Sequence, residues 1–316
     1  MNTAANYEFL TGMPPPGYAF NFDNYLFNTL RHMRLQGPDM RLDFLLLNRS
    51  RRRIEAKIHF LVESGVAWSP YRSLFGSFEF NHRLATGLLG EFAAFTMDHL
   101  KGQGLHRAVI THPADCYGPL KARKVQEVLL ALNFTETLCA VNHHIVVNDR
   151  PLTDKMHAME IRRLNRCRRE GLVFTEEPAE KAEEVYRFIE DCRAGQGLRP
   201  SIGLDLLQVY LRDFPQQYRL FVVRRGVDLC AATVAIRVHK KVLYNFLPAS
   251  PERYNTLSPT VMLLEGLCDY AAGRGYELLD LGISTTPDGR NQDGLIRFKE
   301  RMGALPGWKS RYEKSI

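Results

Sequence analysis

The chain has 316 residues, of which 45% are hydrophobic and 24% are charged, and this length allows two domains of about 150 residues. It lacks an apolar run of about 20 residues, which excludes a transmembrane helix, and its first 20 residues lack the pattern of a signal peptide, so we expect a cytoplasmic protein. The net charge of +7 suggests a polyanionic partner such as nucleic acid, a nucleotide-linked substrate or an anionic membrane surface, unless the excess of arginine only aids solubility.

The six cysteines are spread singly through the chain, and no C-x-x-C pair occurs. This spacing argues against a zinc site and against a disulfide framework. We therefore expect reduced thiols and no bound metal. We expect His143 and His144, which have no third ligand near them in sequence, to be surface or hairpin residues rather than metal ligands.

The first half of the chain predicts a mixed sheet flanked by helices, because a hairpin is followed by alternating helices and strands. In chain order we expect a helix at 23–36, strands at 40–47, 54–62 and 77–80, a helix at 88–100, a strand at 107–111, a helix at 120–132 and a strand at 136–147.

The second half repeats this order without any residue-by-residue period. It begins with a helix capped by Thr153-Asp154 that runs to about residue 170 and carries five arginines. Of these, Arg162, Arg166 and Arg169 lie along one face, either as a solvated surface or as a contact for phosphates. After it we expect a strand at 172–175, helices at 179–194 and 204–212, and strands at 218–223, 227–238 and 242–247. A helix opened by the Ser258-Pro259 cap and a last strand at 308–312 follow.

The most informative segment is residues 277–303, which predicts a buried strand, a polar loop with a turn at Pro287-Asp288-Gly289, and a short helix. In the strand, alternation places Leu279, Leu281 and Ile283 on one face. In the helix, Lys299 falls within the apolar arc. An ammonium group at that position must find a partner, reach water or shift its pKa, because burying it alone is costly.

Three features of residues 218–303 resemble the Fem-type (FemAB-like) proteins, which are tandem GNAT-fold transferases of the acyl-CoA N-acyltransferase superfamily. The first is the hairpin containing 230–234 and 242–246, and the second is the helix beginning at Pro259 before the strand 279–282. The third is the segment 294–303, in which Phe298-Lys299 is closely followed by Gly303.

The resemblance implies an α/β (α+β) fold of two GNAT-like domains, each a mixed, mostly antiparallel sheet flanked by helices. We place them at 1–150 and 151–316. It also implies a bacterial enzyme that transfers an acyl or aminoacyl group to an amine of a cell-envelope-type precursor. The acceptor would be a small molecule or a lipid- or nucleotide-linked compound, with tRNA and a peripheral membrane contact as further partners.

The donor is left open by the loop before the Pro259 helix. GNAT enzymes hold the CoA pyrophosphate with backbone N–H groups of a glycine-containing loop, whereas residues 249–258 contain no glycine. The sequence therefore identifies no cofactor with certainty, and we expect either aminoacyl-tRNA or acyl-CoA as the donor substrate.

Candidate catalytic residues follow from the needs of acyl transfer to an amine. The resemblance implies that Lys299 is the family's lysine after phenylalanine, and it would stabilise the oxyanion or a nearby phosphate, with Phe298 and Ser284 beside the substrate. Asp280 is either a base or a structural carboxylate, and Tyr244 either a proton donor or a core residue. Glu79, between two phenylalanines, is a further candidate base or amine contact.

Two arginines that flank the strand at 77–80, Arg72 and Arg83, could hold an acidic acceptor. Two alternatives to an active transferase remain: a catalytically degenerate GNAT scaffold, and a basic nucleic-acid (tRNA)-binding protein. The second rests only on the net charge and the arginine helix, since no known nucleic-acid-binding motif is present.

Overall fold

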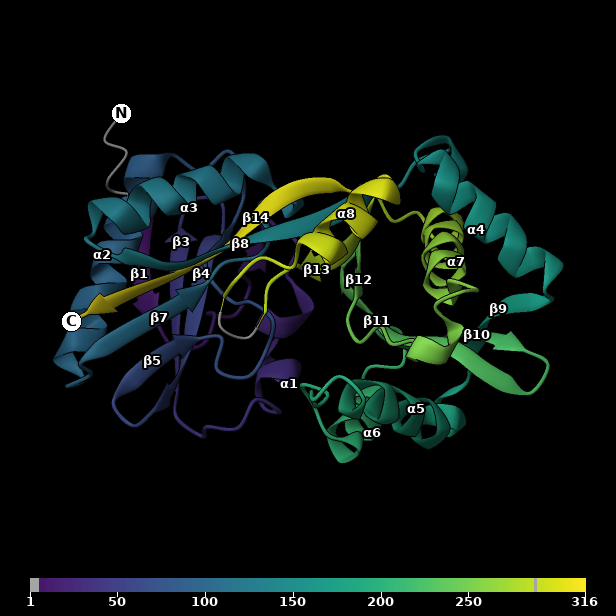
Figure 1. Cartoon of the computed structure of the whole chain (residues 1–316). Helices are drawn as coiled ribbons and strands as arrows, with labels where there is room; N and C mark the ends of the chain where they lie inside the picture. Colours follow the sequence, from purple (N-terminus) through teal and green to yellow (C-terminus); the bar gives the residue numbers. More distant parts are fainter. Residues whose placement is uncertain (1–5, 287–288) are drawn as a thin grey trace. The chain divides into compact units, whose positions relative to one another are not determined.

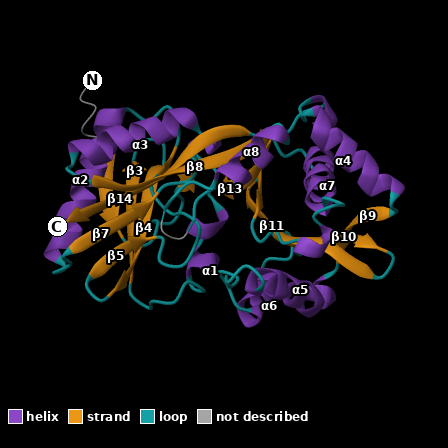
Figure 2. Cartoon of the chain, in the orientation of Figure 1, coloured by secondary structure: helices purple, strands orange, loops and turns teal. Residues whose placement is uncertain are grey.

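The computed structural model describes residues 6–286 and 289–316, which divide into two compact units. Unit 1 contains the chain up to Val141 together with Gly307–Ile316, and unit 2 contains Asn142–Pro306. Figures 1 and 2 show that each unit combines a sheet with helices, which confirms the predicted α/β class. Pro287 and Asp288 of the predicted turn lie outside the described residues.

Unit 1 contains a mixed sheet in the order β1-β3-β4-β5-β7-β14, followed by the first part of β8, while β2 and β6 pair with β4. Its strands are β1 (Tyr7–Thr11), β2 (Ala19–Phe20), β3 (Arg41–Asn48), β4 (Arg53–Glu63), β5 (Val66–Ser69), β6 (Glu79–Phe80), β7 (Arg107–Thr111), β8 (Thr135–Val146) and β14 (Leu305–Ser315). Its helices are α1 (Leu30–Met33), α2 (Thr86–Gly102) and α3 (Pro119–Ala131). The core packs α2 and α3 against the sheet.

Unit 2 contains strands in the order β13-β12-β11-β10-β9, with Asn142–Val146 of β8 pairing antiparallel to β13. Its other elements are α4 (Ala158–Arg169), β9 (Leu172–Glu177), α5 (Ala182–Ala194), α6 (Leu204–Asp213), β10 (Tyr218–Arg225), β11 (Asp228–His239), β12 (Val242–Asn245), α7 (Pro259–Gly273), β13 (Leu278–Ile283) and α8 (Asp293–Arg301). The apolar helix α7 is the centre of this core, because its side chains contact residues of β9, β10, β11 and β13.

Most predicted elements appear within a few residues of their expected ends, and β7 has the predicted bounds. The helix expected at 23–36 is wrong: only a 3-10 turn (Leu26–Asn28) and the short α1 form there. The helix expected from Thr153-Asp154 starts later, with His157 as its N-cap. Ser258 occupies the N-cap position of α7, but its hydroxyl bonds to the Asn255 carbonyl at 3.1 Å and makes no cap hydrogen bond.

The C-terminal strand departs most from a simple division of the chain at residue 150. Residues Arg311–Ser315 of β14 pair antiparallel with β7, so the end of the chain belongs to unit 1. Strand β1, which was not predicted, pairs with β3 at one edge of the same sheet. No helix within the described ranges is both long and apolar enough to cross a membrane.

Candidate active site

The end of β13 is distorted by a β-bulge at Gly282, where the register with β8 shifts. Gly282 has φ +71°, and the carboxylate of Asp280 accepts a hydrogen bond from its N–H at 2.7 Å. The amide of Asn142 donates to the same Asp280 oxygen at 2.9 Å. Because the bulge interrupts the alternation of the strand, Ile283 is 38% exposed, and its predicted place on the buried face with Leu279 and Leu281 is wrong.

Lys299 is buried, as its position in the apolar arc of α8 predicts, with only 5% of its surface exposed. Its ammonium donates hydrogen bonds to the carbonyl oxygens of Gly282 at 2.8 Å and Ile283 at 3.2 Å. Burial lowers the pKa of Lys299 to about 8, and the nearby Asp280 carboxylate opposes this shift. Lys299 therefore holds the bulge of β13 and places a positive charge inside unit 2.

Tyr244 packs against the same bulge from β12. A Cβ atom added at Gly282 would lie 2.8 Å from the Tyr244 hydroxyl oxygen, so only glycine fits there. Burial raises the pKa of Tyr244, and the Asp280 carboxylate raises it further. Tyr244, Asp280 and Lys299, all predicted from the sequence, thus meet around one backbone distortion.

Ser284 is fully buried, and its hydroxyl lies 3.3 Å from Nδ1 of His143. The expectation that His143 is a surface residue is therefore wrong, because the end of β8 that carries it is covered within unit 2. Burial lowers the pKa of His143 to about 4, with a further contribution from the charge of Lys299. The imidazole is thus neutral at physiological pH.

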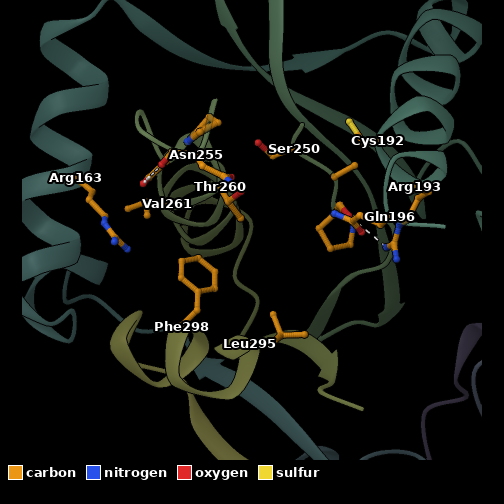
Figure 3. Close-up of a pocket in the computed structure, with 14 residues that line it drawn as sticks. Arg163, Cys192, Arg193, Gln196, Ser250, Asn255, Thr260, Val261, Leu295 and Phe298 are labelled. Carbon is orange, nitrogen blue, oxygen red and sulfur yellow. Dashed lines mark hydrogen bonds between the residues drawn. The ribbon is translucent and has the colours of Figure 1, made fainter. Parts of the chain in front are cut away.

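A pocket of about 480 Å³ lies between α8 and the first turn of α7. Figure 3 shows Phe298 and Leu295 extending into it from α8, with Arg163 of α4 on one side and Arg193 and Gln196 on the other. Lys299 does not line the pocket, but its neighbour Phe298 does. The pocket therefore combines an apolar wall with two guanidinium groups.

The two arginines are held in different ways. Arg163 donates to both carboxylate oxygens of Glu160 at 3.0 Å, and Glu160 is completely buried one turn earlier in α4. Arg193 donates to the carbonyl of Pro248 at 3.3 Å. No pattern in the sequence pointed to Arg193, and Arg163 was one of the five arginines of the predicted helix without being selected among them.

The loop from Ala249 to Ser258 uses its backbone donors internally. The N–H groups of Tyr254 and Asn255 bond to the carbonyls of Pro251 and Glu252, and those of Leu257 and Ser258 both bond to the carbonyl of Tyr254. These four donors cannot hold a phosphate as the donors of a glycine-containing loop do. These four N–H groups are therefore not available to an anionic ligand in the pocket.

Three of the predicted site residues lie in unit 1, and each has a different environment. Glu79 is buried and forms an ion pair with Lys57 at 2.9 Å, while also accepting a hydrogen bond from the Tyr25 N–H. Arg72 is exposed and stacks over the Tyr71 ring, 5.1 Å from its centroid. Arg83 is exposed and lines a second pocket of about 660 Å³.

Arg162, Arg166 and Arg169 are exposed along α4. No ion pair to any of the three is present in the part of the chain that the structure describes, whereas Arg168 pairs with Glu265 at 2.6 Å. Free guanidinium groups at i, i+4 and i+7 form a positive stripe suited to a polyanion. No group of three metal-ligating side chains occurs within residues 6–286 and 289–316.

Comparisons with known proteins agree with this geometry. Residues 156–299 match the acetyltransferase (GNAT) domain family. No curated protein matches the sequence. Among solved structures, FemX is 10% identical with a TM-score of 0.71, and the match covers 93% of each chain.

Two further structures share the fold. L-PGS from Bacillus licheniformis is 14% identical, with a TM-score of 0.57 over 82% of this chain and 80% of that one. A tandem GNAT protein from the clavulanic acid biosynthesis pathway is 12% identical, with a TM-score of 0.54 over 98% of each chain. At such low identities these matches establish the tandem GNAT fold, as predicted, and not a substrate.

Proposed function

We propose that the chain, whose residues 156–299 match the acetyltransferase (GNAT) domain family, is a Fem-type N-acyltransferase that transfers an acyl or aminoacyl group to an amine. The observation that carries this proposal is the pocket between α8 and the first turn of α7. Its wall of Phe298 and Leu295 suits the acyl end of a donor, and Arg163 and Arg193 suit the phosphate groups of the remainder.

Two features favour aminoacyl-tRNA over acyl-CoA as donor. The backbone N–H groups of Tyr254, Asn255, Leu257 and Ser258 are already bonded, which reduces the backbone support for a CoA pyrophosphate. The exposed stripe of α4, formed by the three arginines Arg162, Arg166 and Arg169, offers a contact for a longer polyanion.

The reaction balances without a covalent enzyme intermediate. The acceptor amine attacks the donor carbonyl, a C–N bond forms, the ester C–O bond breaks, and the departing hydroxyl takes up the proton that the amine loses. The buried ammonium of Lys299 does not line the pocket, so its proposed role is to stabilise through space the negative charge that develops on the carbonyl oxygen, because a charge acts strongly where water is excluded. Asp280 fixes the bulge through Gly282, and the Tyr244 hydroxyl is the candidate donor of a proton to the leaving group.

The acceptor is proposed to be the amine of a cell-envelope-type precursor, lipid- or nucleotide-linked. In the test, the protein is incubated with a mixed aminoacyl-tRNA pool or with acetyl-CoA, together with envelope precursors that bear a free amine, and amide products are identified by mass spectrometry. Lys299→Met should lower turnover by at least about a hundredfold while donor binding stays within a few fold. Lys101→Met, which removes an exposed lysine of α2, should leave turnover unchanged.

Donor binding separates the proposal from its alternatives. Arg163→Gln and Arg193→Gln should each weaken donor binding about tenfold, and Arg187→Gln on the exposed face of α5 should not. Salt-sensitive tRNA binding without transfer to any acceptor would favour a nucleic-acid-binding protein instead. Absence of both binding and transfer would favour a degenerate scaffold.

A further inference from the structure

One face of β4 in unit 1 is both charged and buried. Ala56, Ile58 and Phe60 point into the core with α2, and the alternating Glu55 and Lys57 on the opposite face are only 8% and 9% exposed. A strand with this alternation is expected to leave its polar face in water. Something in unit 1 therefore covers these charges.

The cover is the segment from Ala19 to Asn28. Strand β2 pairs in parallel with the start of β4, and the N–H of Asn21 bonds to the carbonyl of Ile54 at 3.2 Å. Lys57 lies beneath this segment and donates to the carbonyl of Asn28 at 2.9 Å, in addition to its ion pair with Glu79. The charge of Lys57 is thus fully compensated.

The charge of Glu55 is not compensated. Its carboxylate accepts a hydrogen bond from the side-chain amide of Asn21, and within the described ranges it has no ion pair and no second hydrogen bond. The amide oxygen of Asn21 is itself buried and has no hydrogen-bond partner among the described residues. A buried carboxylate without a counter-ion and an orphaned acceptor next to it are costly unless a ligand completes them.

Both side chains line the pocket of about 660 Å³ that also includes Arg51 and Arg83. These two arginines are exposed, and no ion pair to either occurs in the described part of the chain. The pocket therefore has the carboxylate of Glu55 in its buried part, and its exposed part carries the two guanidinium groups together with the carboxylate of Glu91. Tyr7 is part of its wall, so an aliphatic chain can lie between the two charged regions.

We propose that this pocket binds a primary amine that carries an anionic group at the other end of a short chain. The ammonium pairs with Glu55 and donates a second hydrogen bond to the amide oxygen of Asn21. The anionic group pairs with Arg51 and Arg83. All four residues belong to unit 1, whereas the residues that line the donor pocket belong to unit 2, and the proposed amine site does not rest on the proposed transfer reaction.

The test uses 6-aminohexanoate as a probe on the full-length protein, with binding measured by calorimetry or by ligand-observed NMR. Hexanoate lacks the ammonium and hexylamine lacks the anion, so each should bind at least about tenfold more weakly than 6-aminohexanoate. Equal binding of hexanoate, or no saturable binding of 6-aminohexanoate up to about 20 mM, would overturn the proposal.

Variants assign the two ends of the probe. Glu55→Gln should weaken 6-aminohexanoate at least about tenfold and leave hexanoate unchanged, and Glu127→Gln, an equal charge change on the exposed face of α3, should alter neither. Arg51→Gln and Arg83→Gln should each weaken the probe about two- to fivefold, less so in high salt.

A stability measurement distinguishes a ligand site from a structural carboxylate. Without ligand, Glu55→Gln should unfold at an equal or higher urea concentration than the wild type, because a neutral amide is cheaper to bury than a carboxylate without a counter-ion. A folded Glu55→Gln protein that keeps the wild-type affinity for 6-aminohexanoate would contradict the assignment.

Discussion

At the scale of single residues, Lys299 connects the sequence pattern with the chemistry. Helical periodicity alone predicts that its side chain points into the protein, and the structure supplies the partners, which are the carbonyl groups of Gly282 and Ile283. These two neutral carbonyl groups accept hydrogen bonds from the ammonium group, which has three N–H donors, and they cannot cancel its charge. The lowered pKa of about 8 is the expected result of that imbalance.

This pKa predicts how Lys299 affects stability. Because the folded-state pKa of about 8 is below the ordinary value of 10.5, the unfolded chain binds more protons between these pH values, and the contribution of Lys299 to the unfolding free energy rises across this interval. The rise should be on the order of 3 kcal/mol. Urea unfolding of wild type and Lys299→Met from pH 7.5 to 10.5 measures it, and the variant should show a flatter curve.

Lys101→Met is the control for this measurement, because its lysine is exposed and its curve should follow the wild type. Parallel curves for wild type and Lys299→Met would mean that the ammonium is better solvated than its surroundings indicate.

At the scale of elements, helix α7 fixes the geometry of the donor pocket. It is buried on most sides, and its first turn forms one wall of the pocket. It approaches β9 closely at Gly266, where an added Cβ atom would lie 2.3 Å from the ring of Phe174. That ring stacks on Phe221 with a centroid distance of 5.5 Å, so it has little freedom to move away.

Gly266→Ala should therefore destabilise unit 2 by about 1–3 kcal/mol, although alanine is the better helix former. Gly273→Ala, at the end of the same helix with no atom within 4 Å of the added Cβ, should be neutral or slightly stabilising. The urea midpoints of the two variants give the comparison. A stable Gly266→Ala protein would show that α7 can shift on the sheet.

At the scale of the whole molecule, both units bury neutral histidines. Burial lowers the pKa of His32 and His143 to about 4 and that of His112 to about 3, and it holds the pKa of His59 well below its ordinary value. Three of these belong to unit 1 and one to unit 2. In acid each of these imidazoles takes up a proton, and protonation is less favourable in the folded protein than in the unfolded chain.

The folded pKa values are below the ordinary value of 6.5, so this contribution to stability is present above pH 6.5 and is lost as the pH falls toward 4. We expect the urea midpoint to fall steeply over this interval, since a few kcal/mol per histidine is comparable to the whole stability of a domain. His112→Gln should make the dependence shallower, and His82→Gln, at an exposed position, should not. A midpoint that stays constant from pH 6.5 to 4.5 would refute this prediction.

Local sequence patterns were enough to predict the elements that bury residues of their own repeat. The apolar arc of α8 identified Lys299 as inward, the Ser258-Pro259 pair marked the start of α7, and short apolar segments marked most of the strands in both units. These signals are local, because a helix or strand buries the residues that its own repeat brings to one face.

Features that depend on contacts between segments distant in sequence were visible only in the folded protein. The bulge at Gly282 exposed Ile283, β14 joined β7, and the Ala19–Asn28 segment covered the charged face of β4. In the same way α4 and α5 brought Arg163 and Arg193 to one pocket. A local sequence pattern cannot predict which distant segment will cover a polar face, because this depends on the packing of the whole unit.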